Sequence, residues 1–278
     1  MTRRTALFAV AASAAAQPKT LTAGEVVERI RRAVGVPWRA ETVDTLKTGN
    51  TDTPVTGIAT TFMSTLDVMQ RAVASGKNMI ITHEPTFYAH DDGTKDTAGD
   101  STLLAKQAFI EKNRVVVFRF HDHWHMRRPD GIRTGMLAEL GWQQYEKPGE
   151  RVLEMPPTTL EALAKSIKDR LRIRAIRVMG NPKQTIARVA LNPGYANLAG
   201  AVRALQNADV LVIGEAREWE AYEYVQDMLA AGSRKSLIVL GHAVSEEGGM
   251  KECARWLKPL VPEVDVAHVP AGEPFWSL

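Results

Sequence analysis

Cysteine is almost missing from the sequence, and so are the patterns that would assign a function at once. The single thiol, Cys253, cannot form a disulfide within one chain, and the helical spacing of apolar residues over 250–260 predicts a buried, structural role. Neither a Gly-rich phosphate loop nor a Walker-type pattern occurs, which argues against an enzyme that binds nucleoside triphosphates through such a loop. After residue 16 no apolar run approaches the roughly 20 residues that a membrane-spanning helix needs.

A strong charge of one sign is also absent. The chain has 35 Lys and Arg residues against 32 Asp and Glu residues, which gives a formal net charge of +3. Loss of residues 1–16 would remove Arg3 and Arg4 but no acid, and would lower this charge to +1. No basic run alternates with aromatic residues. We therefore expect no nucleic-acid partner.

The N-terminus has the pattern of a secretory signal peptide. Arg3 and Arg4 precede an apolar, Ala-rich run, and Ala14 and Ala16 stand where small residues precede a signal-peptidase cut. The pattern predicts a signal peptide over residues 1–16 and an exported mature protein, periplasmic or extracellular, with no membrane attachment after cleavage. The paired arginines loosely resemble a twin-arginine signal. A frayed N-terminal helix is the alternative, although no amphipathic pattern supports it.

Strand-like and helix-like segments alternate along the rest of the chain, and the alternation occurs twice. Between residues 55 and 125 the order is strand, helix, strand, helix, strand, and a similar order returns between residues 186 and 246. Such alternation is typical of a mainly parallel α/β sheet. The sequence therefore predicts an α/β fold of two similar lobes related by internal duplication, over residues 17–150 and 151–278. Residues 35–54 are rich in Thr, Asp, Gly and Lys and are expected to form a loop.

Three of the seven histidines lie within five residues, directly after a predicted buried strand. This strand covers residues 115–120 and is followed by His121, His123 and His125. If the strand continued, the three imidazoles would share one face, and imidazoles so placed make good ligands for transition metals. Chance clustering on a solvated loop is the alternative.

The internal duplication supplies a second half for such a site. Residues 82–84 correspond to residues 213–215, and His121 with His125 corresponds to His242 with Glu246. Ligands in α/β folds bind where parallel strands end, so the residues at corresponding strand ends are expected to converge between the lobes. The converging residues would be His83, Glu84, His121, His125, Glu215, His242 and Glu246.

A mixture of imidazole and carboxylate groups suits Zn, Mn, Fe or Ni rather than Ca. The set exceeds what one tetrahedral ion needs, so we expect two divalent transition-metal ions that share a carboxylate, as in hydrolytic two-metal sites. Each motif also has a simpler interpretation. His83 and Glu84 could form a solvated turn before Pro85, and Glu246 could stabilise the N-terminus of a helix. The repeat argues against three separate coincidences.

These motifs resemble those of a known family. Residues 81–85, Ile-Thr-His-Glu-Pro, resemble its I-(T/S)-H-H-P segment, and residues 241–246, Gly-His-Ala-Val-Ser-Glu, resemble its G-H-Y-x-(S/T)-E segment. Its H-x-x-x-D segment corresponds to residues 121–125. The family is that of the Ngg-interacting-factor-three-like proteins, also called GTP cyclohydrolase 1 type 2 homologues or the dinuclear-metal-centre hexamer family. The similarity covers most of residues 55–255.

The resemblance implies a two-lobed fold, a two-metal centre and a toroidal homohexamer. The metal ligands it implies are His83, Glu84, His125, His242 and Glu246. Glu84 stands in place of the family's second histidine and His125 in place of its aspartate, so the two exchanges balance in formal charge. His121 corresponds to a histidine beside the metals, and we assign it a catalytic role. A metallo-β-lactamase pattern, H-x-H-x-D-H, is met only at its first two positions, His121 and His123.

The sequence thus favours an exported, dinuclear metal-dependent hydrolase that acts on a small molecule. A cyclic amide, a nucleotide and a phosphoester are the candidate substrate classes. His121 or His123 would relay a proton. A non-enzymatic metal-binding or metal-handling protein with the same ligands is the chief alternative, and an interaction module whose metal site has decayed is a third hypothesis.

Overall fold

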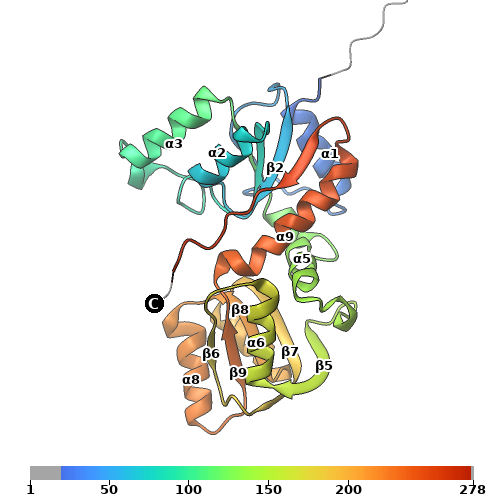
Figure 1. Ribbon diagram of the computed structural model, residues 1–278, viewed down its shortest axis with the longest axis vertical. Helices are drawn as coiled ribbons and strands as arrows, with labels where there is room; N and C mark the ends of the chain where they lie inside the picture. The colour runs from blue at the N-terminus through green and yellow to red at the C-terminus, as the bar shows by residue number, and fades with distance from the viewer. Residues whose placement is uncertain (1–19, 277–278) are drawn as a thin grey trace, which may run out of the picture.

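The computed structural model describes residues 20–276 and has two lobes joined by a pair of helices (Figure 1). Each lobe is built on a five-stranded sheet whose central strands are parallel. The predicted signal peptide, residues 1–16, lies outside the described residues. Within the described part of the chain, no helix is both long and apolar enough to cross a membrane.

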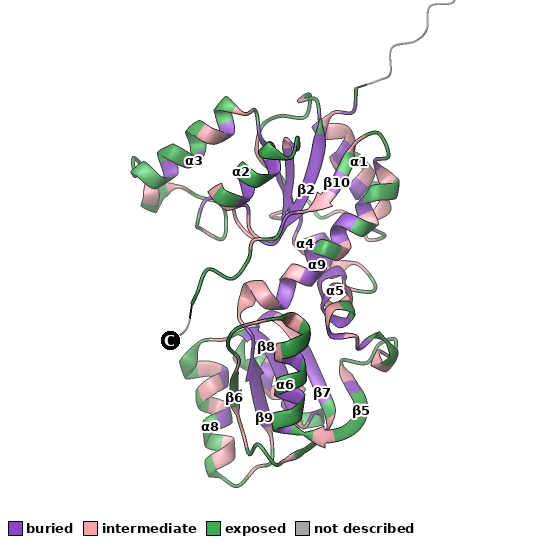
Figure 2. Ribbon diagram, viewed as in Figure 1, coloured by how far each residue is buried: buried purple, intermediate pink, exposed green. Residues whose placement is uncertain are grey.

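The first sheet has the strand order β1-β4-β3-β2-β10, and only β1 runs antiparallel to its neighbour. Its strands are β1 (Leu46–Thr48), β2 (Gly57–Thr61), β3 (Met79–Thr82), β4 (Val116–Arg119) and β10 (Asp265–His268). The helices of this lobe are α1 (Ala23–Ala33), α2 (Leu66–Ala74), α3 (Ser101–Lys112) and the short α4 (Asp122–Met126). Apolar side chains of the sheet pack against α1 on one face and against α2 and α3 on the other, so β2, β3 and β4 are fully buried (Figure 2).

The second sheet has the strand order β5-β7-β8-β9-β6, with β5 and β6 as antiparallel edges. Its strands are β5 (Val152–Thr159), β6 (Arg177–Met179), β7 (Thr185–Tyr195), β8 (Val210–Glu215) and β9 (Ser236–Val239). Its helices are α6 (Leu160–Leu171), α7 (Leu198–Asn207) and α8 (Glu223–Ala230), which follows a π-helical turn at Glu218–Tyr222. Short 3-10 turns lie at Lys95–Thr97, Gln143–Tyr145 and Lys258–Leu260.

Two helices, α5 (Gly131–Leu140) and α9 (His242–Leu257), cross between the lobes (Figure 1). They touch at glycines, since a Cβ atom on Gly135 would lie 2.1 Å from the carbonyl oxygen of Gly248. The later residues of α9, among them Met250 and the fully buried Cys253, belong to the core of the first lobe. Burial raises the pKa of the Cys253 thiol, as expected for a structural cysteine. α9 therefore fixes the two lobes relative to one another.

The predicted α/β fold is confirmed, and several element boundaries agree closely with the sequence. α1 begins with a capping box, in which Thr22 and Glu25 each accept a backbone N–H of the other. Both sheets contain three consecutive parallel strands, which is the order that an internal duplication would produce. The duplication itself, and the boundary at residue 150, stay predictions. The last strand, β10, returns to pair with β2, so the first sheet also includes residues from the end of the chain.

Two local predictions are wrong. The expected loop over residues 35–54 contains the edge strand β1, which pairs with β4. The histidine cluster does not continue β4, because the chain turns there into helix α4. The buried carboxylate of Asp44 accepts the backbone N–H groups of His121, Asp122 and His123 and so stabilises the start of that helix. The interpretation of three histidines on one strand face is therefore excluded.

Candidate metal centre

Histidines and glutamates gather at the carboxyl ends of the parallel strands, where the two lobes meet. His83 and Glu84 directly follow β3, and His121 follows β4 by one residue. His242 is the first residue of α9 and comes shortly after β9, and Glu246 lies one helical turn further on. Corresponding strand ends of both lobes thus supply side chains to one site, as the repeated sequence order predicts.

The Glu246 carboxylate lies at the centre of the cluster. Its Oε2 atom is 3.3 Å from His83 Nε2 and 3.2 Å from His242 Nε2, and its Oε1 atom is 3.8 Å from His125 Nε2. The Glu84 carboxylate completes the other side, with Oε1 placed 3.5 Å from His242 Nε2 and 3.9 Å from His121 Nε2. Four imidazoles and two carboxylates therefore face a common centre through Nε2 and carboxylate oxygens.

Each of the four imidazoles is oriented by a partner on its outer nitrogen. The Nδ1 atoms lie 2.9–3.2 Å from oxygen acceptors, which are the Phe120 carbonyl for His83, Asp122 for His121, Asp130 for His125 and Glu215 for His242. With the proton on Nδ1, each Nε2 lone pair points into the cluster. Metal-binding histidines are commonly held in this way.

The residues present fit a divalent metal ion. His83 Nε2 and Glu246 Oε2 are buried and have no hydrogen-bond partner, a costly arrangement that a bound cation would relieve. Ligand atoms of His83, His121 and His125 lie within 4.8 Å of one another, and so do those of His83, Glu84 and Glu246. Imidazole and carboxylate donors together suit transition metals better than Ca²⁺.

The charges of the cluster favour an ionised Glu246 and a neutral His121. Burial disfavours the Glu246 carboxylate, but the charges of His83 and His242 outweigh burial and hold its pKa well below the usual range. Burial, together with the neighbouring imidazoles of His83 and His125, lowers the pKa of His121 to about 3. His121 therefore carries a free lone pair at neutral pH.

A glycine of the second lobe closes the cluster on one side. A Cβ atom on Gly194 would lie 2.2 Å from Glu246 Oε1 and 3.3 Å from His242 Nε2, and Gly194 has a left-handed φ of 74°. Its backbone N–H donates to the Ser245 hydroxyl at 2.8 Å. Gly194, which lies where the pairing of β7 with β8 is irregular, thus forms a wall of the site.

The structure brings together six of the seven side chains expected to converge: His83, Glu84, His121, His125, His242 and Glu246. The seventh, Glu215, lies outside the cluster and contacts His242 Nδ1. Their roles as ligands and catalyst stay predictions. His123 is directed elsewhere, because its Nδ1 atom lies 2.6 Å from Asp44 and its Nε2 atom accepts the backbone N–H of Arg39. Its ring also stacks on Trp38 at 3.7 Å. The suggested proton relay through His123 is therefore wrong.

Sequence reasoning missed the residues that support the cluster from outside. Asp130 and Asp122 orient histidines, and Asp44 holds α4. Arg119 is fully buried beside Glu84. A charged residue that ends a buried strand was the only available signal for Arg119, since the partner contacts depend on the tertiary fold.

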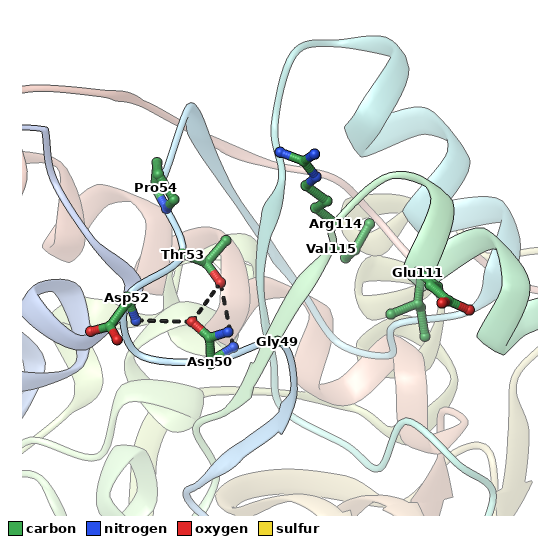
Figure 3. Close-up of a pocket in the computed structure, with 9 residues that line it drawn as sticks. Gly49, Asn50, Asp52, Thr53, Pro54, Glu111, Arg114 and Val115 are labelled. Carbon is green, nitrogen blue, oxygen red and sulfur yellow. Dashed lines mark hydrogen bonds between the residues drawn. The ribbon is translucent and has the colours of Figure 1, made fainter.

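A pocket of about 420 Å³ lies at the opposite end of the first sheet (Figure 3). It is lined by residues that precede β2 and β4 or follow β1, among them Asn50, Pro54 and Arg114. This end carries the amino ends of the parallel strands, whereas the cluster lies at their carboxyl ends. The pocket is therefore separate from the candidate metal centre.

The fold and the cluster define a two-lobed α/β protein with a candidate metal-binding site between its lobes. Residues 22–272 match the family described as Duf34/NIF3 (NGG1p interacting factor 3), and the chain belongs to this family.

Relatives of known sequence and structure agree with this assignment. A Clostridium acetobutylicum protein named GTP cyclohydrolase 1 type 2 homolog is 26% identical over 195 residues, which cover 66% of this chain and 69% of the relative. A Campylobacter jejuni protein of the same name is 27% identical, with 74% of this chain and 80% of the relative covered. A Bacillus cereus protein related to NIF3 has the same fold, with a TM-score of 0.76 over 94% of this chain and 100% of that chain, at 15% identity.

Proposed function

We propose that the protein is an exported hydrolase that uses two divalent transition-metal ions, drawn from Zn, Mn, Fe and Ni. The observation that carries the proposal is the convergence of four imidazole Nε2 atoms and two carboxylates on one centre, where His83 Nε2 and Glu246 Oε2 lack partners. The relatives' name supports a hydrolytic reaction, since a cyclohydrolase is a hydrolase. The substrate would be a small molecule such as a cyclic amide, a nucleotide or a phosphoester.

The ligands would be His83, Glu84, His125, His242 and Glu246. The bound ions would lower the pKa of water and polarise a substrate oxygen. Glu246 is the carboxylate placed to be shared, because one of its oxygens faces His83 and His242 while the other faces His125. The outer acceptors on Nδ1 keep the imidazoles in the tautomer that binds through Nε2.

His121 is the candidate proton acceptor. Its Nε2 atom faces the cluster, and its Nδ1 atom lies 2.9 Å from Asp122 Oδ1. A proton taken up at Nε2 would create an imidazolium, which burial and the neighbouring imidazoles disfavour and which the Asp122 carboxylate stabilises through Nδ1. A ligand atom of His121 also lies within 4.8 Å of ligand atoms of His83 and His125, so His121 could bind metal as well. The variant His121→Gln separates proton transfer from metal binding. Full metal content with lost turnover supports the relay, and lost metal supports ligation.

Steady-state hydrolysis by the metal-loaded mature protein tests the enzymatic proposal. Phosphoesters, cyclic amides and nucleotides are offered in turn to the wild type and to Glu246→Gln. Turnover that the variant loses supports a hydrolase. Tight metal binding without turnover of any class would contradict it and favour a metal-handling protein. Metal absent after purification without chelators would favour a module whose site has decayed.

Export and assembly belong to the same proposal. After cleavage of residues 1–16 the mature chain would begin at Gln17, outside the cytoplasm. Fractionation and N-terminal sequencing of the protein expressed in a bacterium test this, and a cytosolic chain that retains Met1 would contradict it. A homohexamer predicts a light-scattering mass six times that of the chain, and a monomeric mass would contradict it.

A further inference from the structure

Arg119 is a buried cation directly behind the candidate metal centre. Its side chain is fully buried at the end of β4, where its Nη2 atom lies 3.3 Å from Glu84 Oε2. Its Nε atom donates to the carbonyl of His83 at 3.1 Å, and Nη1 donates to the carbonyl of His90. One side chain thus holds both the backbone of His83 and the carboxylate of Glu84, the two residues that begin the cluster.

The two oxygens of Glu84 have different surroundings. Oε2 faces the guanidinium of Arg119, whereas Oε1 faces His242 Nε2 at 3.5 Å and His121 Nε2 at 3.9 Å. A carboxylate that no neighbouring group holds can bind a metal through one oxygen or through both. With Oε2 held by Arg119, only Oε1 is directed into the cluster.

The position of Arg119 does not depend on Glu84 alone. The Asp92 carboxylate lies 3.6 Å from Nη1 and 3.2 Å from Lys47 Nζ, and it also accepts the backbone N–H groups of Thr86 and Phe87. Arg119 is therefore anchored by a second carboxylate and by backbone carbonyls. A guanidinium fixed in this way can impose an orientation on Glu84.

We propose that Arg119 is a positioning residue that makes Glu84 a one-atom metal ligand, equivalent in that respect to an imidazole. An imidazole offers a single ligand atom, and so does a carboxylate whose other oxygen is already held. Arg119 occupies the surplus oxygen and balances the charge that a carboxylate adds. The inference rests on the proposed metal centre and deepens it.

Titration with Co²⁺, whose visible absorption reports its coordination, tests the proposal. Arg119→Lys keeps the positive charge but loses the planar guanidinium, whose three nitrogens hold His83, His90 and Glu84. We therefore expect Co²⁺ affinity to fall by about tenfold to a hundredfold, as for other residues that orient a ligand. We also expect a changed absorption spectrum, because the freed Glu84 can bind through both oxygens. Glu84→Gln should weaken binding as well, and the double variant should bind no worse than Glu84→Gln alone. Additive losses, or an unchanged Arg119→Lys, would overturn the proposal.

A second pair of variants guards against a folding defect. Arg119→Met with Glu84→His removes both charges of the pair together, so neither is left unpaired. We expect this double variant to bind Co²⁺ within about threefold of Glu84→His alone, while Arg119→Met with Glu84 retained binds far more weakly. Equal losses in both Arg119→Met proteins would show a purely structural role and overturn the proposal.

The matched control is Arg29→Lys. Arg29 also pairs with a carboxylate, that of Glu263, and donates to a backbone carbonyl, that of Leu260. The Arg29→Lys variant should leave the Co²⁺ affinity and the Co²⁺ absorption spectrum unchanged. If the wild type binds no Co²⁺, the proposed metal centre fails, whereas stoichiometric binding that Arg119→Lys does not alter overturns only the role of Arg119.

Discussion

His242 Nε2 lies 3.2 Å from Glu246 Oε2, one helical turn away on α9. The same helix carries Cys253 into the core of the first lobe and packs against α5 through glycines. The pair is therefore held by the element that joins the lobes, while His83, His121 and His125 reach it from the first lobe. A change in how the lobes sit would move these two sets of ligands apart.

Glu246→Gln should abolish stoichiometric metal binding. The amide offers one weaker ligand oxygen and cannot neutralise a cation between three imidazoles. Since loss of an outer partner already costs about tenfold to a hundredfold in affinity, we expect a loss beyond about a hundredfold. Elemental analysis and competition with a chromophoric chelator measure it.

Glu247→Gln is the matched control for that experiment. Glu247 is the next residue along α9 but pairs with His268 and accepts the backbone N–H of Ala271. Its variant should keep the full metal content. An equal loss of metal from both variants would show that the substitutions disturb helix α9 rather than remove a ligand.

His125→Ala and His123→Ala should have opposite effects. His125 faces Glu246, so its loss should lower metal content with little change in stability. His123 faces Asp44 and Arg39 and stacks on Trp38, so its loss should lower the free energy of unfolding by about 2 kcal/mol and leave metal content unchanged. Elemental analysis and urea denaturation distinguish them, and metal loss in both would contradict a purely structural role for His123.

The sequence predicts the site well where the signal is local or repeated. The strand ends that carry His83 and His242 followed from the repeated order of strands and helices. Long-range contacts carry no such signal. Asp44 lies far from the histidines in sequence, yet its bonds to their backbone turn the predicted extension of β4 into a helix.

Support for the ligands was hidden from the sequence for the same reason. Arg119 reads as one charged residue at the end of an apolar run, and only the fold brings it to Glu84. The strand β10 is short, and its pairing with β2 joins residues 208 positions apart in the sequence. Neither hydrophobic periodicity nor the order of the elements therefore predicted that it returns to the first sheet.

Metal binding should release a proton from His242. Burial disfavours its imidazolium, but the charges of Glu246 and Glu84 outweigh burial and raise its pKa to about 9. The metal-free protein therefore keeps this proton at pH 7.5, and an ion must displace it. Apparent affinity should rise with pH, by up to about tenfold per unit from this group, and level off above about pH 9.

Calorimetry in buffers of different ionisation enthalpy counts the released protons. We expect about one fewer proton released above pH 9 than at pH 7.5. In the metal-free protein the raised pKa adds stability that is full below the unfolded value near 6.5 and is lost as the pH rises through about 9. A proton count that stays constant over this range would contradict the assignment.

Gly194→Ala should damage the metal centre more than it damages the fold. Gly194 and Gly232 both have left-handed φ angles, of 74° and 83°, so alanine at either position should cost about 1 kcal/mol of stability from backbone strain. Only at Gly194 does the new Cβ meet a ligand, at 2.2 Å from Glu246 Oε1, while Gly232 has no atom within 4 Å. Gly194→Ala must displace the carboxylate that three imidazoles face, so we expect metal affinity to fall at least tenfold, a loss like that caused by disturbing a ligand's support. Gly232→Ala, with equal strain, should bind metal as the wild type does. Thermal unfolding and chelator competition on both variants separate backbone strain from displacement of the Glu246 carboxylate. Equal metal affinities of the two variants would show that Gly194 does not shape the site.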